Sequence, residues 1–196
     1  NALKNNNIDD NTIIIFLGDN GTDRKVFTKN NNVIVKGSKG LTNKYGTNIP
    51  LIISWSKLKK IKSEQTALVD LTDFYSTFED LLNVKKKTSN GVSLMPLLLG
   101  ENFAERKYIT TYYNPMWGSL YKNRAVYIQN KKYKLYKSGR FYNYQLDPEE
   151  NHPLSLKTLD ELTMNLHTEM DSILKKVPEL PEINFNNWQE RLRVSN

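Results

Sequence analysis

The first half of the chain alternates continuously apolar runs with polar, turn-forming segments. Residues 12–17 are apolar and rich in β-branched side chains, and residues 50–55 have the same character after Pro50. Such uninterrupted runs predict strands that are buried on both faces of a sheet. Proline is compatible with the first position of a strand, because no ladder donor is needed there. A shorter extended segment is predicted at residues 33–35, and residues 3–8 read as the end of a helix.

The period of the apolar residues changes after Asp70. The following segment places one apolar face on a predicted helix, made of Leu71, Phe74, Tyr75, Phe78, Leu81 and Leu82. Asp70 is positioned to cap this helix, and Asp73 would favour the positive end of its dipole.

The second half contains four short segments rich in aromatic residues, at residues 107–113, 124–129, 133–137 and 141–145. A turn signal separates the last two, so the segments predict a small antiparallel sheet. A long helix with an apolar face is predicted from about residue 155, ended by Pro178. We therefore divide the chain into an α/β region, residues 1–105, and a small α+β subdomain, residues 106–196.

Composition narrows the class of protein. The 196 residues are 38% hydrophobic and 11% aromatic, which is typical of a globular chain. The net charge of +7 is spread over lysines near turns rather than along one helix face, so no nucleic-acid partner is expected. No apolar run approaches the roughly 20 residues of a membrane span, so we expect none. The absence of cysteine excludes disulfides and thiolate metal ligands.

The candidate chemistry lies where the first predicted strand ends, in Gly18-Asp19-Asn20-Gly21. Open α/β sheets bind ligands at the carboxyl ends of their strands. The oxygens of Asp19 and Asn20 are of the kind that Ca²⁺ or Mg²⁺ prefers. Lys39 lies on the next glycine-rich loop, from which it could return toward them. Taken alone, the Asp-Asn-Gly sequence is also a common turn signal, and Lys39 could be an ordinary surface lysine.

Six segments, in this order, resemble landmarks of formylglycine-dependent sulfatases in the alkaline-phosphatase superfamily. They are the strand at residues 10–16 with Gly18-Asp19-Asn20-Gly21; Lys39-Gly40 followed by Gly46-Thr47 and Pro50-Leu51-Ile52; and residues 68–71, 91–98, 133–136 and 147–151. The resemblance implies an α/β fold class. The chain would form the C-terminal part of the sulfatase mixed sheet together with a small antiparallel-sheet-and-helix subdomain.

The resemblance also implies the activity and its residues. Asp19 and Asn20 would bind Ca²⁺ (or Mg²⁺), and Lys39 would be the catalytic residue that contacts the sulfate of a sulfated small molecule or carbohydrate. Sulfate ester hydrolysis accumulates negative charge on oxygen, so fixed positive charge at that point is what catalysis needs. Family members of this kind suggest a bacterial periplasmic or secreted protein.

The chain departs from the family in one essential respect. The family's nucleophile is a formylglycine made from a Cys or Ser in a short N-terminal signature, and this chain has no Cys and no Ser in that pattern. We expect the formylglycine and the remaining metal ligands to lie in a missing N-terminal portion of the same fold. The fragment alone should be inactive, should expose apolar strand faces and should be poorly soluble. In the retained loop, Lys44 and Asn48 replace the Glu and Arg of many relatives.

Several other residues have two interpretations. Trp117, in an aromatic loop at residues 112–118, could bind substrate by stacking on a ring or could pack between the two parts of the chain. Asp23 and Arg24 could orient the metal ligands or form a surface ion pair. His152 and His167 are expected to be structural.

Two alternatives to a sulfatase remain open from the sequence. One is a non-catalytic sulfatase-like domain retained for binding, and the other is a phosphoesterase of the same superfamily. The Lys-Gly, Gly-Thr and Pro segments favour sulfate over phosphate. A nucleic-acid-binding module is a more distant class, which a steep salt dependence of binding would reveal.

Overall fold

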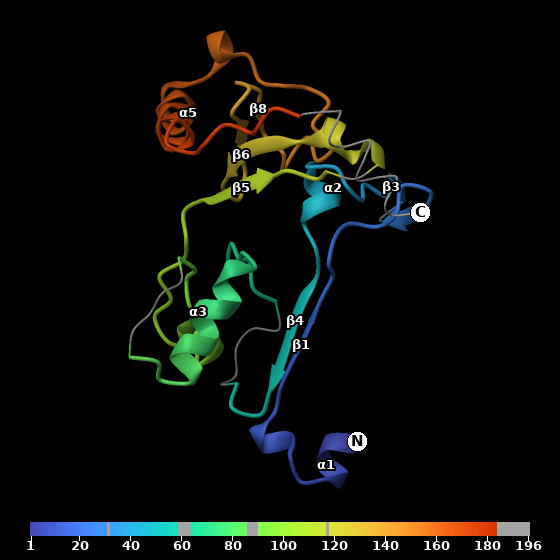
Figure 1. Ribbon diagram of the computed structural model, residues 1–196, viewed down its shortest axis with the longest axis vertical. Coiled ribbons are helices and arrows are strands. Elements are labelled where there is room, and N and C mark those ends of the chain that lie inside the picture. Colours follow the sequence, from blue (N-terminus) through green and yellow to red (C-terminus); the bar gives the residue numbers. More distant parts are fainter. Residues whose placement is uncertain (31, 59–63, 86–89, 117, 184–196) are drawn as a thin grey trace.

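The computed structural model describes residues 1–30, 32–58, 64–85, 90–116 and 118–183. Over these ranges the fold is mixed α/β, with small antiparallel sheets and helices, as the predicted fold class requires (Figure 1). After a short N-terminal helix α1 (Ala2–Asn5), a two-stranded ribbon runs between the N-terminus and a four-stranded sheet at the other end of the molecule. No helix within these ranges is long and apolar enough to cross a membrane.

The ribbon pairs β1 (Ile13–Leu17) with β4 (Leu51–Trp55), the two apolar runs that the sequence predicts as strands. The prediction that both faces are buried is wrong for this chain. Ile14, Phe16 and Ile52 are 50%, 60% and 60% exposed, and Phe16 is paired with Ile52 on the same face. Helix α3 (Thr72–Leu81) lies on one side of the ribbon, and no other described element covers the opposite side (Figure 1). The expected exposure of apolar strand surface is therefore confirmed.

A second hairpin pairs β2 (Phe27–Asn30) with β3 (Val33–Lys36). The extended segment at residues 33–35 is confirmed, whereas β2 was missed because a single phenylalanine followed by polar residues gives no strand pattern. The short helix α2 (Lys44–Thr47) follows, and the side chain of Asn43 caps it by accepting the Gly46 amide at 3.0 Å.

Helix α3 buries its polar face, contrary to the prediction. Its buried residues are Asp73, Ser76, Thr77 and Glu79, while Leu71, Tyr75, Phe78 and Leu82 of the predicted apolar face are exposed. The predicted capping role of Asp70 is wrong, because the N-cap of α3 is Leu71 and no side chain caps the helix. Oδ1 of Asp70 instead accepts hydrogen bonds from the backbone amide and the hydroxyl of Thr72.

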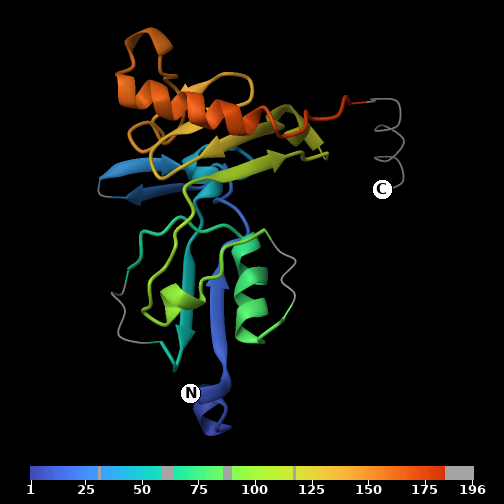
Figure 2. The same ribbon diagram turned by 90° about the vertical axis from the view of Figure 1, so that its left-hand side faces the viewer.

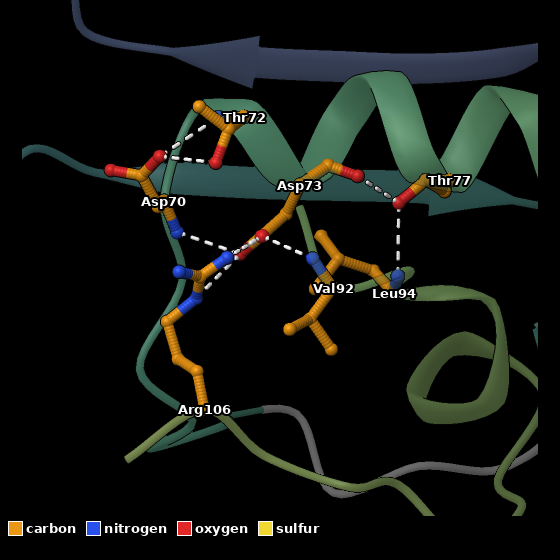
Figure 3. Close-up of polar contacts among 7 residues, drawn as sticks. All are labelled: Asp70, Thr72, Asp73, Thr77, Val92, Leu94 and Arg106. Atoms are coloured by element: carbon orange, nitrogen blue, oxygen red, sulfur yellow. Dashed lines mark hydrogen bonds and ion pairs between the residues drawn. The ribbon is translucent and has the colours of Figure 1, made fainter. Parts of the chain in front are cut away.

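Asp73 explains why the polar face turns inward (Figure 3). Its carboxylate accepts the amides of Asp70 and Val92, each at 2.8 Å, and forms an ion pair with Arg106. One buried carboxylate thus connects the start of α3 to two segments that follow it, with α4 (Met95–Leu98) between them. The helix is held by hydrogen bonds on this side rather than by apolar packing.

The four-stranded sheet has the order β5 (Ile109–Tyr113), β6 (Ala125–Gln129), β7 (Lys134–Tyr136) and β8 (Phe141–Tyr142). All four strands and the turn at residues 137–140 are confirmed, with Gly139 at a φ of +88°. Helix α5 (Glu161–Leu174) packs on one face of the sheet (Figure 2). The core between them contains Val126, Ile128, Leu135, Phe141, Met170 and Leu174.

The predicted bounds of α5 were too wide. A 3₁₀ turn at Leu156–Thr158 precedes the helix, and the side chain of Asp160 caps its N-terminus by accepting the Thr163 amide at 2.7 Å. Because the cap fixes the first turn, the helix begins at Glu161 rather than near residue 155, and it ends at Leu174 before Pro178 is reached.

The opposite face of the sheet is lined by tyrosines and faces the loop at residues 40–44. Tyr127, Tyr136 and Tyr142 form a buried cluster there with Ala125. The two faces differ in composition because successive side chains along each strand point to opposite sides of the sheet. Hydrogen bonds cross from this face to the first part of the chain, so the boundary near residue 105 remains a prediction.

Candidate active site

The candidate metal ligands lie on the turn that follows β1. The turn is anchored at both ends, because the amide of Gly18 donates to the Pro50 carbonyl at 3.2 Å and that of Gly21 to the Gly46 carbonyl at 3.0 Å. Asp19 is exposed and Asn20 is half-buried. Neither side chain has a partner among the described residues, so their oxygen atoms are available to a ligand.

Lys39 lies on the loop after β3, and its backbone is fixed from two directions. Its amide donates to the Thr22 carbonyl at 2.9 Å, and its carbonyl accepts a hydrogen bond from Nε of Arg24 at 2.9 Å. The side chain itself is exposed. The structure therefore brings the Lys39 loop alongside the segment that continues directly from Asp19 and Asn20.

Two glycines allow close packing of backbone on backbone here, Gly37 against the segment that follows Asn20 and Gly21 against α2. A Cβ atom at Gly37 would lie 2.0 Å from the Asp23 carbonyl oxygen, and one at Gly21 would lie 2.1 Å from the Tyr45 carbonyl oxygen. No side chain fits at such distances. Glycine is thus required at Gly37 in the Lys39 loop and at Gly21 in the turn after β1, because each packs directly against the backbone of another segment.

Arg24 supports the site in a way that the sequence did not reveal. A surface ion pair with Asp23 was one of its two interpretations, but the described residues show no ion pair between them. Instead Arg24 donates to the backbone of Lys39, and Oδ1 of Asp23 accepts the Lys25 amide at 2.9 Å. Arg24 is therefore placed to hold the Lys39 loop.

The C-terminal half of the chain also holds the loop that follows Lys39. The Gly40 carbonyl accepts hydrogen bonds from Nδ2 of Asn123 at 2.8 Å and from the Tyr113 hydroxyl at 3.4 Å. The Lys44 amide donates to the Pro148 carbonyl at 3.0 Å. Neither Asn123 nor Tyr113 was predicted as a site residue, and the signal available was that Tyr113 lies in the aromatic loop.

The remaining candidates are placed as follows. Trp117 lies outside the described residues, so its proposed stacking role stays a prediction. His167 packs edge-on against Phe141, with ring centres 5.1 Å apart, and the amide of exposed His152 donates to Asp147 at 2.8 Å. Both contacts are consistent with structural roles.

The oxygen donors of Asp19 and Asn20 suit a divalent cation in kind but not in number. Asp19 and Asn20 offer hard oxygen atoms of the type that Ca²⁺ and Mg²⁺ bind. The described ranges contain no group of three or more His, Cys, Asp or Glu side chains that could hold a metal ion. The two residues fit the chemistry of such an ion, but they supply only part of the six to eight ligands that Ca²⁺ takes.

Comparisons with known proteins point to the same family as the sequence segments that resemble sulfatases. The family model described as Sulfatase matches residues 1–84. An uncharacterized sulfatase of Escherichia coli K12, YdeN, is 33% identical over 136 residues, covering 61% of this chain and 24% of that protein.

Solved structures show the same fold. The PsFucS1 sulfatase from Pseudoalteromonas sp. aligns with a TM-score of 0.62 at 22% identity, over 91% of this chain and 40% of its own. BT4656, solved in complex with D-glucosamine-2-N,6-O-disulfate, aligns with a TM-score of 0.59 at 23% identity, over 89% and 35%. The chain thus spans between a quarter and two fifths of the length of these relatives.

Proposed function

We propose that this chain, which belongs to the sulfatase family, supplies two metal ligands and one sulfate contact to the active site of a sulfuric ester hydrolase. The observation that carries the proposal is the pairing of the turn after β1 with the Lys39 loop through the backbone of Thr22 and Lys39. Asp19, Asn20 and Lys39 would act together because their segments are locked side by side.

Each residue has a distinct part in the proposed chemistry. Asp19 and Asn20 would hold Ca²⁺ or Mg²⁺, which when bound supplies a Lewis acid beside the sulfate oxygens. Lys39, with its backbone fixed and its side chain exposed, would direct its ammonium at the same oxygens and stabilise the charge that develops there. A fixed backbone matters because charge that is already oriented needs no reorganisation during the reaction.

The nucleophile would come from outside this sequence. The chain has no cysteine and no serine in the formylglycine pattern, so we expect it to be inactive alone. The open face of the β1–β4 ribbon and the exposed apolar side of α3 would then be covered by the remaining portion of the same fold. The greater length of the relatives supports this arrangement.

We propose a sulfated carbohydrate as the substrate class. The support comes from BT4656, whose structure contains a disulfated glucosamine and whose fold this chain shares. The sulfate contact assigned to Lys39 is common to any sulfate ester, so the choice between sugars would be made by other residues.

The test uses the longest natural gene product that contains this sequence. Sulfate release is measured from D-glucosamine-2-N,6-O-disulfate and from an aryl sulfate, with and without added Ca²⁺. We expect Ca²⁺-dependent release, a loss of about a hundredfold or more in kcat/KM for Lys39→Ala, and no change for Lys29→Ala, an exposed lysine on β2. Asp19→Asn should raise the Ca²⁺ concentration needed for half-maximal activity.

Three results would contradict the proposal. Full activity in Lys39→Ala would remove the sulfate contact. A folded product that binds the disulfated sugar without releasing sulfate would identify the non-catalytic binding domain instead. Faster release of phosphate from the matching phosphate ester would identify a phosphoesterase.

A further inference from the structure

A buried charged cluster lies on the tyrosine face of the four-stranded sheet. Lys134 has no exposed surface, and its Nζ atom lies 2.8 Å from Oε1 of Glu150. The centre of the Tyr127 ring is 4.3 Å from the same Nζ atom, and the rings of Tyr136 and Tyr144 are at 5.5 and 5.8 Å. A desolvated ammonium needs such a carboxylate and such ring faces to stay charged.

The cluster reaches beyond its own sheet to the segment that follows Lys39. Nζ of Lys134 donates to the Thr42 carbonyl, and the Tyr136 hydroxyl is 2.8 Å from Oγ1 of Thr42. The Tyr136 hydroxyl also donates to Oε2 of Glu150, which leaves the Thr42 hydroxyl to donate to Tyr136. Both the backbone carbonyl and the side chain of Thr42 are therefore held.

Glu150 shows that the cluster overrides local backbone preference. Its φ of +61° lies in the left-handed region, and the other described non-glycine residues with positive φ are the asparagines Asn7, Asn32 and Asn83. Asparagine is enriched in this region, whereas a glutamate adopts it only where its surroundings fix it. The turn that positions Glu150 is closed by its amide, which donates to the Asp147 carbonyl at 3.1 Å.

We propose that Lys134, Tyr136 and Glu150 are positioning residues that fix the backbone of residues 40–44 and thereby the direction from which Lys39 approaches the sulfate. The role of Lys39 in this statement rests on the proposed function, whereas the fixing of the loop does not. Loop residues on both sides of Thr42 are held by the same subdomain, through Asn123 at Gly40 and Pro148 at Lys44. The cluster supplies the central attachment between them.

Amide hydrogen exchange tests the positioning role without any assay of activity. Tyr136→Phe removes one hydroxyl and keeps the ring, and Tyr142→Phe is the matched control, a buried tyrosine of the same face whose hydroxyl has no partner among the described residues. In the natural gene product, Tyr136→Phe should speed exchange at the Leu41, Lys44 and Gly46 amides about tenfold. Exchange in β6 should stay unchanged, and so should the loop in Tyr142→Phe.

The activity of the same variants tests the connection to Lys39. If the loop directs Lys39, Tyr136→Phe lowers kcat by about tenfold with little change in melting temperature, and Tyr142→Phe does not. Thr42→Val removes the hydroxyl that bonds to Tyr136, on the loop side of the same contact. This variant should show the same loss of kcat as Tyr136→Phe.

The outcomes separate the two proposals. Unchanged exchange at residues 41–46 in both Tyr136→Phe and Thr42→Val overturns the positioning role, whatever the activity. Faster exchange with unchanged kcat in an active wild type overturns the link to Lys39. An inactive wild type whose loop exchanges faster in the variants contradicts the proposed function and leaves the fixing of the loop supported.

Discussion

Tyr127 shows how a buried residue on the supporting sheet couples stability to pH. Burial raises its pKa from 10.0 to about 12, and the nearby charges of Glu150 and Asp70 act in the same direction. The unfolded chain loses this proton at a lower pH than the folded one. The stability that Tyr127 contributes is therefore complete below pH 10 and is lost as the pH rises toward 12.

We predict that the chain loses roughly 2 to 3 kcal/mol of unfolding free energy through Tyr127 between about pH 10 and 12. Burial also lowers the pKa of Lys134 below its usual 10.5. Through Lys134, the unfolding free energy therefore rises with pH up to about 10.5 and no longer changes with pH above that value. The decline should thus be steepest above about pH 10.5. Urea unfolding across this range checks it. Tyr127→Phe should reduce the decline without abolishing it, because burial also raises the pKa values of Tyr136 and Tyr144. Tyr75→Phe, on the exposed side of α3, should leave it unchanged.

At the scale of elements, the buried carboxylate of Asp73 organises α3 and the chain that follows it. Asp73→Ala would leave Arg106 and two backbone amides without their acceptor inside the protein. We predict a loss of about 3 to 5 kcal/mol in unfolding free energy, measured by urea denaturation.

An exposed ion pair in α5 gives the matched control for Asp73. Oδ2 of Asp171 lies 2.7 Å from Nζ of Lys175, with both side chains partly in solvent. Asp171→Ala should cost less than about 0.5 kcal/mol, because water screens and replaces such a pair. Equal losses in the two variants would show that the Asp73 hydrogen bonds add nothing to stability.

The elements also show what the sequence could and could not predict. β1, β4 and the four strands of the sheet were predicted because each is a run of apolar or aromatic residues bounded by turn residues. Such a pattern can be recognised within a few neighbouring positions of the sequence. The orientation of α3 was not, because its six apolar positions give the same pattern whether a partner surface is present or absent. The buried polar side depends on Arg106, more than 30 residues away, and no local rule connects the two.

The candidate site could also be predicted only in part from the sequence. Asp19, Asn20 and Lys39 were proposed from motif and resemblance and remain predictions, whereas the closeness of their segments is explained by Gly37, which is visible in the sequence. The supports of the loop were missed. Lys134, Tyr136 and Glu150 were noted only within landmark segments, because the contacts of Lys134 and Tyr136 with Thr42 span more than 90 residues of sequence.

At the scale of the whole molecule, the exposed apolar surface sets the behaviour of the chain in solution. Ile14, Phe16 and Ile52 form one open side of the ribbon, and α3 exposes further apolar side chains. We predict that this chain alone associates at micromolar concentration and binds a hydrophobic dye, because an open apolar patch of this kind drives association. Light scattering and dye fluorescence measure both effects.

Phe16→Lys combined with Ile52→Lys should reduce the association, since the two residues face each other across the ribbon. The control places the same two charges at Leu146 and Leu162, which are about 80% exposed in the other half of the chain. A wild-type chain that is monomeric and binds no dye would contradict the prediction, and so would equal solubilisation by the control pair.

The attachment of the Lys39 loop to the far end of the chain has a consequence for the order of folding. Thr42 is 94 residues from Tyr136 and Gly40 is 83 residues from Asn123 along the sequence. Contacts between such distant residues form late, because a long loop must close before they are gained. During synthesis, the segment carrying Lys39 leaves the ribosome well before its attachments exist. The arrangement therefore makes completion of the C-terminal sheet a checkpoint, and a chain that stalls before residue 134 would carry the Lys39 loop without its central attachment.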